Sequence, residues 1–458
     1  MEAFDYWLNA VKLLSGGSPV LVVLNKADQR IKEIDQGALR AKFGNIVDFY
    51  KVSALKGQGM LELARDIRAN IVKLPHVGDE WPGTWTAVRQ ALEKKKDLRN
   101  YIDYPEYLEL CRREGLEKGQ AGLLSGYLHD LGVILHFQDD PVLREIVILK
   151  PEWGTNAVYA VLDTKKVQQN RGRFSLEDLR EIWGRTNYPP EKHPELLQLM
   201  IRFELCFPLE GSQEYIAPEL LSGEPPRFAW DGRNNLHFEY HYDFMPAGIM
   251  TRFIARNHAW IDGGCYWKNG VVLSWEASRA LVTADVFSSP RKVKVATAGS
   301  DKKGMLAVVR REFARIHQTL NSPEVRQMIP CICAQCRQGE PFLFEYQRVA
   351  RYHEGGMKEM ICDRSLKPVP IEGLLSGVFT ESEVRENRTD PEGRTVVVHG
   401  DYYEVRGGGV KPMKKKEQAV PGPWASGSFY LLSVVVLIVL LAAVGKLVTS
   451  SRQSARCS

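Results

Sequence analysis

The 458 residues are enough for two or three domains and a tail, with ample apolar material for a core. A formal net charge of +5 is small for this length, and much of the basic excess lies near the C-terminus, which argues against a nucleic-acid-binding body. The first residues include Glu2, Asp5 and Asn9 instead of a basic apolar leader. We therefore expect no signal peptide, and eight reduced cysteines in a cytoplasmic compartment.

The run Val20–Leu24 has no polar alternation, which is typical of a buried parallel strand. It ends in Asn25-Lys26-Ala27-Asp28, where the carboxylate of Asp28 can accept hydrogen bonds from N1–H and the exocyclic amino group of guanine. Adenine lacks this pair of donors, so the motif predicts that Asp28 selects guanine. The stem of Lys26 is expected over the base plane, and Asn25 is expected to tie neighbouring loops together.

A second predicted strand, Phe49–Val52, ends in Ser53-Ala54-Leu55, whose backbone N–H groups are expected to meet the guanine carbonyl oxygen. Helices are expected over 34–43 and 60–73. Strand, helix, strand and helix in this order resemble the last third of a Ras-like α/β domain. The candidate guanine-binding residues are Asn25, Lys26, Asp28, Ser53 and Ala54.

The phosphate half of such a site has no counterpart in the sequence. No Gly-x-x-x-x-Gly-Lys-[Ser/Thr] loop occurs, and the Asp-x-x-Gly matches at 301–304 and 390–393 lie far downstream and are interpreted as turns. Before Val20 there is room for one helix, 2–14, and for none of the strands that precede it in a Ras-like domain. Either the chain is a fragment whose true start lies upstream, or the nucleotide site has decayed.

After Pro75, residues 76–227 hold two segments that resemble each other, since 128–137 aligns without gaps on 200–209. Each follows a helical region and precedes a strand carrying Pro-Glu, which predicts two small winged-helix-like units. The second of the aligned helices offers only Arg202 as a cation, too little to neutralise DNA phosphates, so packing is preferred to DNA binding.

Residues 228–322 change to a β pattern, with an Asn269-Gly270 hairpin turn and a basic amphipathic helix over 305–320. The polar pairs His241 with Asp243 and His258 with Asp262 are interpreted as surface residues. No acid-base pair or nucleophile stands out, so no catalytic residue is assigned.

These motifs together resemble the Roco family, in which a Ras-like Roc domain precedes a COR domain. They are the NKxD and SAL motifs, Pro75-His76-Val77-Gly78, Trp85-x-x-Val88-Arg89, Leu131-Gly132-Val133-Ile134, Leu149-Lys150-Pro151-Glu152-Trp153 and Tyr266-Trp267-Lys268-Asn269-Gly270-Val271. The resemblance covers about residues 1–320. It implies a C-terminal part of Roc over 1–75, a COR first half over 76–227, and a COR second half over 228–322 that forms a homodimer.

The resemblance also implies GTP or GDP with Mg²⁺ as cofactor, and GTP hydrolysis supported across the dimer. Only the guanine contacts carry over onto residues of this chain. The family's phosphate, magnesium and switch roles have no matching residues, and the kinase domain and leucine-rich repeats of some relatives are not visible, so GTPase activity stays open.

A small cysteine-rich module is predicted over 323–380. Four soft ligands, Cys331, Cys333, Cys336 and Cys362, could close a tetrahedral zinc site. The alternatives are reduced buried thiols and a redox pair at Cys333 and Cys336. A module of this size has little core, and a metal would stabilise it.

Residues 381–428 are interpreted as a linker, with a small hairpin around 395–405 that has no assigned function. The apolar run 429–448 is long enough to cross the roughly 30 Å hydrocarbon core, and Lys446 can snorkel near its end. The lysines before the span fit a cytoplasmic flank. We expect a single-pass, tail-anchored membrane protein with most of the chain on the cytoplasmic side.

Three functions are compatible with these patterns. The first is a membrane-anchored, Roco-like GTP-binding signalling protein that dimerises through COR and acts on unknown protein effectors. The second is a non-catalytic dimeric membrane scaffold with a decayed nucleotide site. The third, a zinc-dependent interaction or nucleic-acid module, would need a basic face that the sequence does not offer.

Overall fold

The computed structural model describes residues 2–14, 18–29, 33–74, 78, 80–186, 188–231, 235–375, 395–399 and 402–406. The chain divides into two compact units. One holds residues 1–158 with 194–199, and the other holds 159–193 and the chain from Met200 to Ala425, so the division falls within helix α7 (Pro151–Leu162).

The N-terminal segment has the predicted order of helices and strands. Its elements are α1 (Glu2–Leu14), β1 (Val20–Leu24), α2 (Gln36–Lys42), β2 (Ile46–Lys51) and α3 (Met60–Ile71). Strands β1 and β2 pair in parallel. Leu8 of α1 and Leu39 of α2 join Val22 in one apolar cluster, while Leu63 of α3 packs with Tyr50 and Val52 in a second.

The apolar strand β1 is less covered than its composition predicts. Val22 is buried, but Val23 exposes 41% of its surface and Val47 of β2 exposes 37%. The sheet has two strands in the part of this segment that the structure describes. A strand paired on one side only leaves backbone and side chains at its other edge open, which accounts for this exposure.

A first strand–helix–helix–strand repeat follows a long helix. The helix is α4 (Gly83–Leu98), and the repeat consists of β3 (Tyr101–Asp103), α5 (Tyr104–Arg113), α6 (Lys118–Asp130) and β4 (Ile146–Ile148), with the short helix η1 (Leu143–Glu145) before β4. Strands β3 and β4 are antiparallel. The buried Tyr107 of α5 donates a hydrogen bond from its hydroxyl to the carbonyl oxygen of Ala121 in α6, at 2.8 Å.

The second repeat has the same order and an extra strand. After α8 (Lys165–Gln169) come β5 (Arg173–Ser175), α9 (Leu176–Arg185), η2 (Pro190–Lys192), α10 (His193–Arg202), β6 (Phe207–Pro208), β7 (Glu214–Ile216) and η3 (Pro218–Leu220). The strand order is β5-β7-β6, all antiparallel. Ser175 and Asp178 form a reciprocal capping box that starts α9. The two helices and a returning strand of each repeat follow the predicted order, but the strands do not carry the Pro-Glu pairs, because Pro151-Glu152 begins α7 and Pro218-Glu219 lies in η3.

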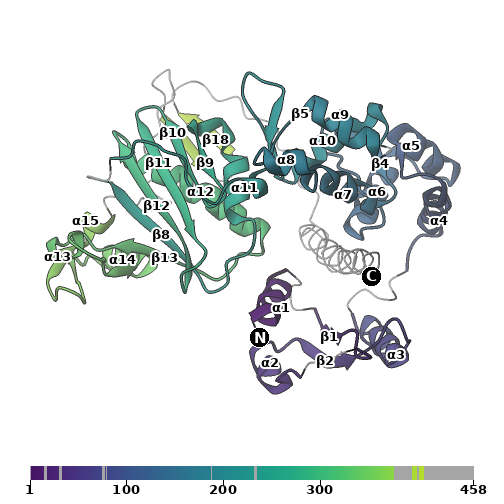
Figure 1. Cartoon of the computed structure of the whole chain (residues 1–458), viewed down its shortest axis with the longest axis horizontal. Helices are drawn as coiled ribbons and strands as arrows, with labels where there is room; N and C mark the ends of the chain where they lie inside the picture. Colours follow the sequence, from purple (N-terminus) through teal and green to yellow (C-terminus); the bar gives the residue numbers. More distant parts are fainter. Residues whose placement is uncertain are drawn as a thin grey trace, which may run out of the picture. The chain divides into compact units, whose positions relative to one another are not determined.

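The sheet domain, residues 235–375, is built on a seven-stranded sheet of order β14-β13-β8-β12-β11-β10-β9 (Figure 1). Its elements are β8 (Leu236–Tyr242), α11 (Ile249–Arg256), η4 (His258–Trp260), β9 (Ile261–Trp267), β10 (Gly270–Trp275), β11 (Ser278–Asp285), β12 (Arg291–Gly299), α12 (Lys302–Thr319), β13 (Val325–Pro330), α13 (Ala334–Arg337), β14 (Leu343–Glu345), α14 (Tyr346–Glu354), β15 (Glu359–Ile361), β16 (Pro368–Pro370) and α15 (Ile371–Leu375).

Helices α11 and α12 pack against this sheet through one apolar core. Phe253 of α11 stacks on Phe313 of α12 with ring centroids 4.5 Å apart, and Tyr240 of β8 lies 5.0 Å from Phe313. A hairpin joins β9 and β10 as predicted, but its turn residues are Lys268 and Asn269, not Asn269 and Gly270. Gly270 begins β10 opposite Trp267, and a Cβ atom there would collide with the indole ring of Trp267. Asp301, in the first Asp-x-x-Gly match, caps α12 through the backbone N–H of Gly304 at 2.8 Å.

The structure differs from the predicted boundary at residue 322. Strand β13 pairs with β8, and β14 extends the sheet beyond it, so the cysteine-rich stretch 323–375 shares a core with the preceding strands. Strands β17 (Thr395–His399) and β18 (Tyr402–Arg406) pair in antiparallel orientation. Among the described residues, no helix has the length and apolarity to cross a membrane, and the predicted span 429–448 lies outside them.

Candidate guanine site and four-cysteine cluster

The five predicted guanine-binding residues lie together, where β1 and β2 end. Parallel strands bring their carboxyl ends to one edge of a sheet, and that edge is where ligands bind in open α/β folds. The side-chain oxygen of Asn25 accepts hydrogen bonds from the backbone N–H of Lys26, at 2.8 Å, and of Ala54, at 3.1 Å. Asn25 therefore joins the two loops in the way the sequence predicts.

Asp28 lies in this edge with only 8% of its side chain exposed. A hydrogen bond from Ser53 is the largest cause that holds the pKa of Asp28 below its ordinary value, and Lys56, with Nζ 3.7 Å from Oδ2, lowers this pKa further. Asp28 is therefore an anion at neutral pH and can only accept hydrogen bonds, as pairing with the two donors of guanine requires.

The side chains of Ser53 and Lys56 are site residues that the sequence motif missed. Ser53 was predicted to act through its backbone, yet its buried hydroxyl also accepts from the N–H of Lys56 at 3.2 Å. The N–H of Ala54 is engaged by Asn25, so a guanine carbonyl oxygen would share this donor. The sequence signal that could have identified these side chains is a lysine that closely follows the Ser-Ala pair.

A glycine and a left-handed lysine shape the two loops. Gly59 adopts φ 71°, and a Cβ atom there would lie 2.7 Å from the carbonyl oxygen of Lys51. The absence of a side chain therefore lets the backbone pack closely against β2 before α3 begins. Lys26 adopts φ 64°, an uncommon conformation for a residue with a side chain, and it is exposed. An exposed, strained residue beside a buried carboxylate is a common feature of binding loops.

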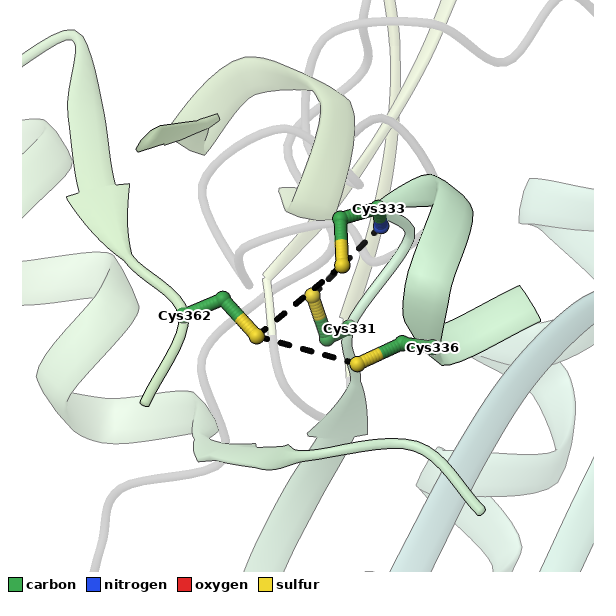
Figure 2. Close-up of side chains that lie close together, drawn as sticks. All are labelled: Cys331, Cys333, Cys336 and Cys362. Carbon is green, nitrogen blue, oxygen red and sulfur yellow. Dashed lines mark hydrogen bonds between the residues drawn. The ribbon is translucent and has the colours of Figure 1, made fainter. Parts of the chain in front are cut away.

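The four cysteines predicted as metal ligands form one cluster (Figure 2). Their sulfur atoms all lie within 4.8 Å of one another. Cys333 Sγ is 3.9 Å and Cys336 Sγ is 3.7 Å from Cys362 Sγ. Cys331, Cys336 and Cys362 are buried, all four are free thiols, and the four side chains converge on a common point in Figure 2.

Two of the four thiols have a lowered pKa, and the other two have a raised pKa. A hydrogen bond to Ser365 lowers the pKa of Cys333 to about 6, and the same hydroxyl lowers the pKa of Cys362 against the effect of burial. Burial raises the pKa of Cys331 and of Cys336. Four sulfurs this close would repel one another as thiolates, so the cluster can be fully ionised only around a cation.

The other two polar pairs considered from the sequence are not formed, and His241 is buried, with 8% of its surface exposed, so its interpretation as a surface residue is wrong. His241 pairs with Glu239 at 2.7 Å, and Asp243 pairs with Arg326 at 3.3 Å. His258 bonds the carbonyl oxygen of Ala255, while Asp262 pairs with Arg279. Each of the four residues thus has a partner outside its proposed pair.

Comparison with known proteins gives the class of this chain. A family model described as "C-terminal of Roc, COR-A domain" matches residues 82–221, and one described as "C-terminal of Roc, COR-B domain" matches residues 233–377. These ranges contain the two repeats and the sheet domain, so the chain is a COR-containing protein. It belongs to the Roco family.

Curated relatives are considerably longer than the region they share with this chain. A Roc-COR-CHAT protease of Runella zeae is 26% identical over 340 residues, which are 71% of this chain and 36% of that protein. The probable serine/threonine-protein kinase pats1 of Dictyostelium discoideum is 26% identical over 59% of this chain and 9% of its own length. The structure of Methanosarcina barkeri Roco2 RocCORdC bound to GDP is similar at 32% identity, over 48% of this chain and 69% of that one, with a TM-score of 0.40.

Proposed function

We propose that the chain is part of a membrane-anchored, GTP-binding signalling protein that dimerises through the second half of its COR domain. The observation that carries the proposal is that Asn25 joins the two loops through its hydrogen bonds from Lys26 and Ala54, beside the anionic carboxylate of Asp28. This arrangement supports a base-recognition half of a guanine site in the N-terminal segment, and the COR domain of a Roco protein follows it.

Guanine recognition would use donors and acceptors that lie at the sheet edge. Asp28 would accept from N1–H and the exocyclic amino group, and the Ala54 N–H would donate to the carbonyl oxygen. The stem of Lys26 would cover the base plane. Magnesium and the phosphates of GTP or GDP would need groups that this sequence does not provide, because it contains no Gly-x-x-x-x-Gly-Lys-[Ser/Thr] loop.

Two observations support a dimer through residues 233–377: the match of this region to the COR-B family model, and the single apolar core that its elements share. The seven-stranded sheet, α11 and α12 share one core with the cysteine-rich stretch, so the whole COR-B region would act as a rigid element in a dimer. Effectors of such a dimer stay unknown.

The second candidate is a non-catalytic dimeric membrane scaffold whose nucleotide site has decayed. Both candidates keep the COR dimer and the anchor. They differ in whether the loops at Asn25 and Ser53 respond to a guanine nucleotide.

Amide hydrogen exchange of the full chain, with and without excess GDP and Mg²⁺, tests the proposal. We expect slower exchange in peptides that contain residues 25–28 and 53–56, because a bound base would restrict both loops. Peptides from α12 serve as the internal control and should not change. An identical effect of ADP would contradict guanine recognition, and no effect of either nucleotide would favour the scaffold.

Deleting residues 429–448 is expected to move the protein from the membrane pellet to the soluble fraction. About 20 apolar residues supply the whole hydrophobic attachment that we propose. Deleting 381–400, a stretch of equal length within the proposed linker, is the matched control and should leave the protein in the membrane. Retention of the 429–448 deletion in the pellet after an alkaline wash would contradict the anchor.

A further inference from the structure

We propose that Cys331, Cys333, Cys336 and Cys362 bind one zinc ion, which joins two segments of the COR-B region, residues 331–336 and the turn after β15, in one structural site. This inference is independent of the proposed function, because it concerns the sheet domain and uses none of the guanine-site residues.

The spacing of the sulfur atoms fits a shared metal. Tetrahedral Zn²⁺ with Zn–S bonds of about 2.3 Å places its sulfur ligands about 3.8 Å apart. The Cys333–Cys362 and Cys336–Cys362 sulfur distances are 3.9 and 3.7 Å. A disulfide would need about 2.05 Å. These two distances are those of ligands to one ion, all four sulfurs lie within 4.8 Å of one another, and all four cysteines are free.

Backbone turns hold each ligand in place without the ion. Cys331 follows β13 and donates its N–H to Phe342 at 2.7 Å, and Cys333 begins helix α13, which carries Cys336. Cys362 follows β15 and donates its N–H to Lys367 at 3.0 Å, while the N–H of Leu366 returns to the Cys362 carbonyl at 2.7 Å. Two segments distant in sequence, residues 331–336 and the turn after β15, thus present their sulfurs to one point.

Hydrogen-bond donors surround the sulfurs as in a thiolate site. The N–H of Cys333 points at Cys331 Sγ at 3.5 Å, and the N–H of Phe342 points at Cys336 Sγ at 3.3 Å. The Ser365 hydroxyl lies 3.4 Å from Cys333 Sγ and can donate to it once that sulfur is ionised. Such donors orient metal ligands and stabilise their negative charge.

The chemical types of the four ligands indicate which metal the cluster would bind and whether the site is structural or catalytic. Four sulfur ligands, with no carboxylate or imidazole among the described residues of the cluster, suit Zn²⁺ and exclude Mg²⁺ and Ca²⁺, which take oxygen ligands. All four tetrahedral positions are filled by protein, so no position is open for water or substrate. The site is structural.

The elements beyond β14 explain what the ion would stabilise. Strands β15 and β16 form a two-stranded hairpin, which is marginal on its own in water. Cys362 lies between these strands, whereas Cys331 extends from β13, which is paired to β8 of the main sheet. One ion at the cluster would therefore join the hairpin to the sheet and add binding energy to folding.

Metal analysis of the purified full chain in detergent tests the inference. Elemental analysis should give about one zinc per chain, as expected of a closed site with four cysteine ligands. Cys336→Ser and Cys362→Ser should each lower the zinc content at least about tenfold, because three thiolates no longer close the site. Cys265→Ser is the matched control, since Cys265 is a half-buried thiol of the same domain, in β9, and should keep the zinc.

A second measurement uses the unchanged protein, so it does not depend on folding of the variants. Titration with an organic mercurial should release the zinc, detected with a colorimetric chelator, as the cluster thiols are modified. A folded protein that contains no metal would overturn the inference. One equivalent of iron, with visible colour, would overturn the assignment to zinc, as would a Cys336→Ser variant that retains its full zinc content.

Discussion

Asp28→Asn is expected to switch the base preference of the nucleotide site from guanine towards xanthine, by at least about 100-fold in the ratio of GDP to xanthosine diphosphate affinity. The Asp28 carboxylate is an acceptor only and matches two donors of guanine. An asparagine amide offers one acceptor and one donor. Xanthine carries a carbonyl group where guanine carries its amino group, so the amide would accept from N1–H and donate to that carbonyl oxygen.

The measurement is competition of the two diphosphates against a fluorescent guanine nucleotide, for the chain and the variant in parallel. Asp35→Asn is the matched control. Asp35 is a carboxylate of the same segment that caps α2 through the N–H of Ala38, at 2.9 Å, and asparagine caps a helix equally well. An unchanged ratio in Asp28→Asn would show that Asp28 does not contact the base.

Phe313→Ala is expected to destabilise the sheet domain by about 3–5 kcal/mol, because it removes a fully buried ring from the centre of the core. Phe313 stacks on Phe253 and contacts Tyr240, so the cavity would be lined by rings from α11 and β8 that cannot collapse together. The midpoint of thermal unfolding of this domain should fall by roughly 10 °C.

Differential scanning calorimetry checks this loss against Phe287→Ala as control. Phe287 is 94% exposed in the connection between β11 and β12, and its truncation should change stability by no more than about 0.5 kcal/mol. Equal effects of the two substitutions would show that α12 is not packed on the sheet as described.

Sequence patterns were sufficient where structure is local. The helices and strands of the N-terminal segment follow from a continuous apolar strand, a second strand and two amphipathic helices. Asn25 and Ala54 could be placed together because parallel strands that are consecutive in the sheet end at the same edge. The Cys-x-Cys-x-x-Cys spacing likewise indicated three ligands that share one turn.

Sequence patterns were insufficient to predict strand pairs whose two members lie far apart in the sequence. Strand β13 joins β8 across more than 80 residues, and its proline-ended six residues gave no sign of that partner. Strands of three residues such as β3 and β5 are too short for alternation to be visible. The effects of Ser53 and Lys56 on Asp28 depend on how the second loop turns, which the motif does not encode.

The central claim is that the loops after β1 and β2 recognise guanine, and equilibrium binding of GDP and ADP to the full chain with Mg²⁺ tests it most directly. The account predicts that GDP displaces a fluorescent guanine nucleotide and that ADP at the same concentration does not. Equal displacement by GDP and ADP, or no binding of either by the folded protein, would contradict it.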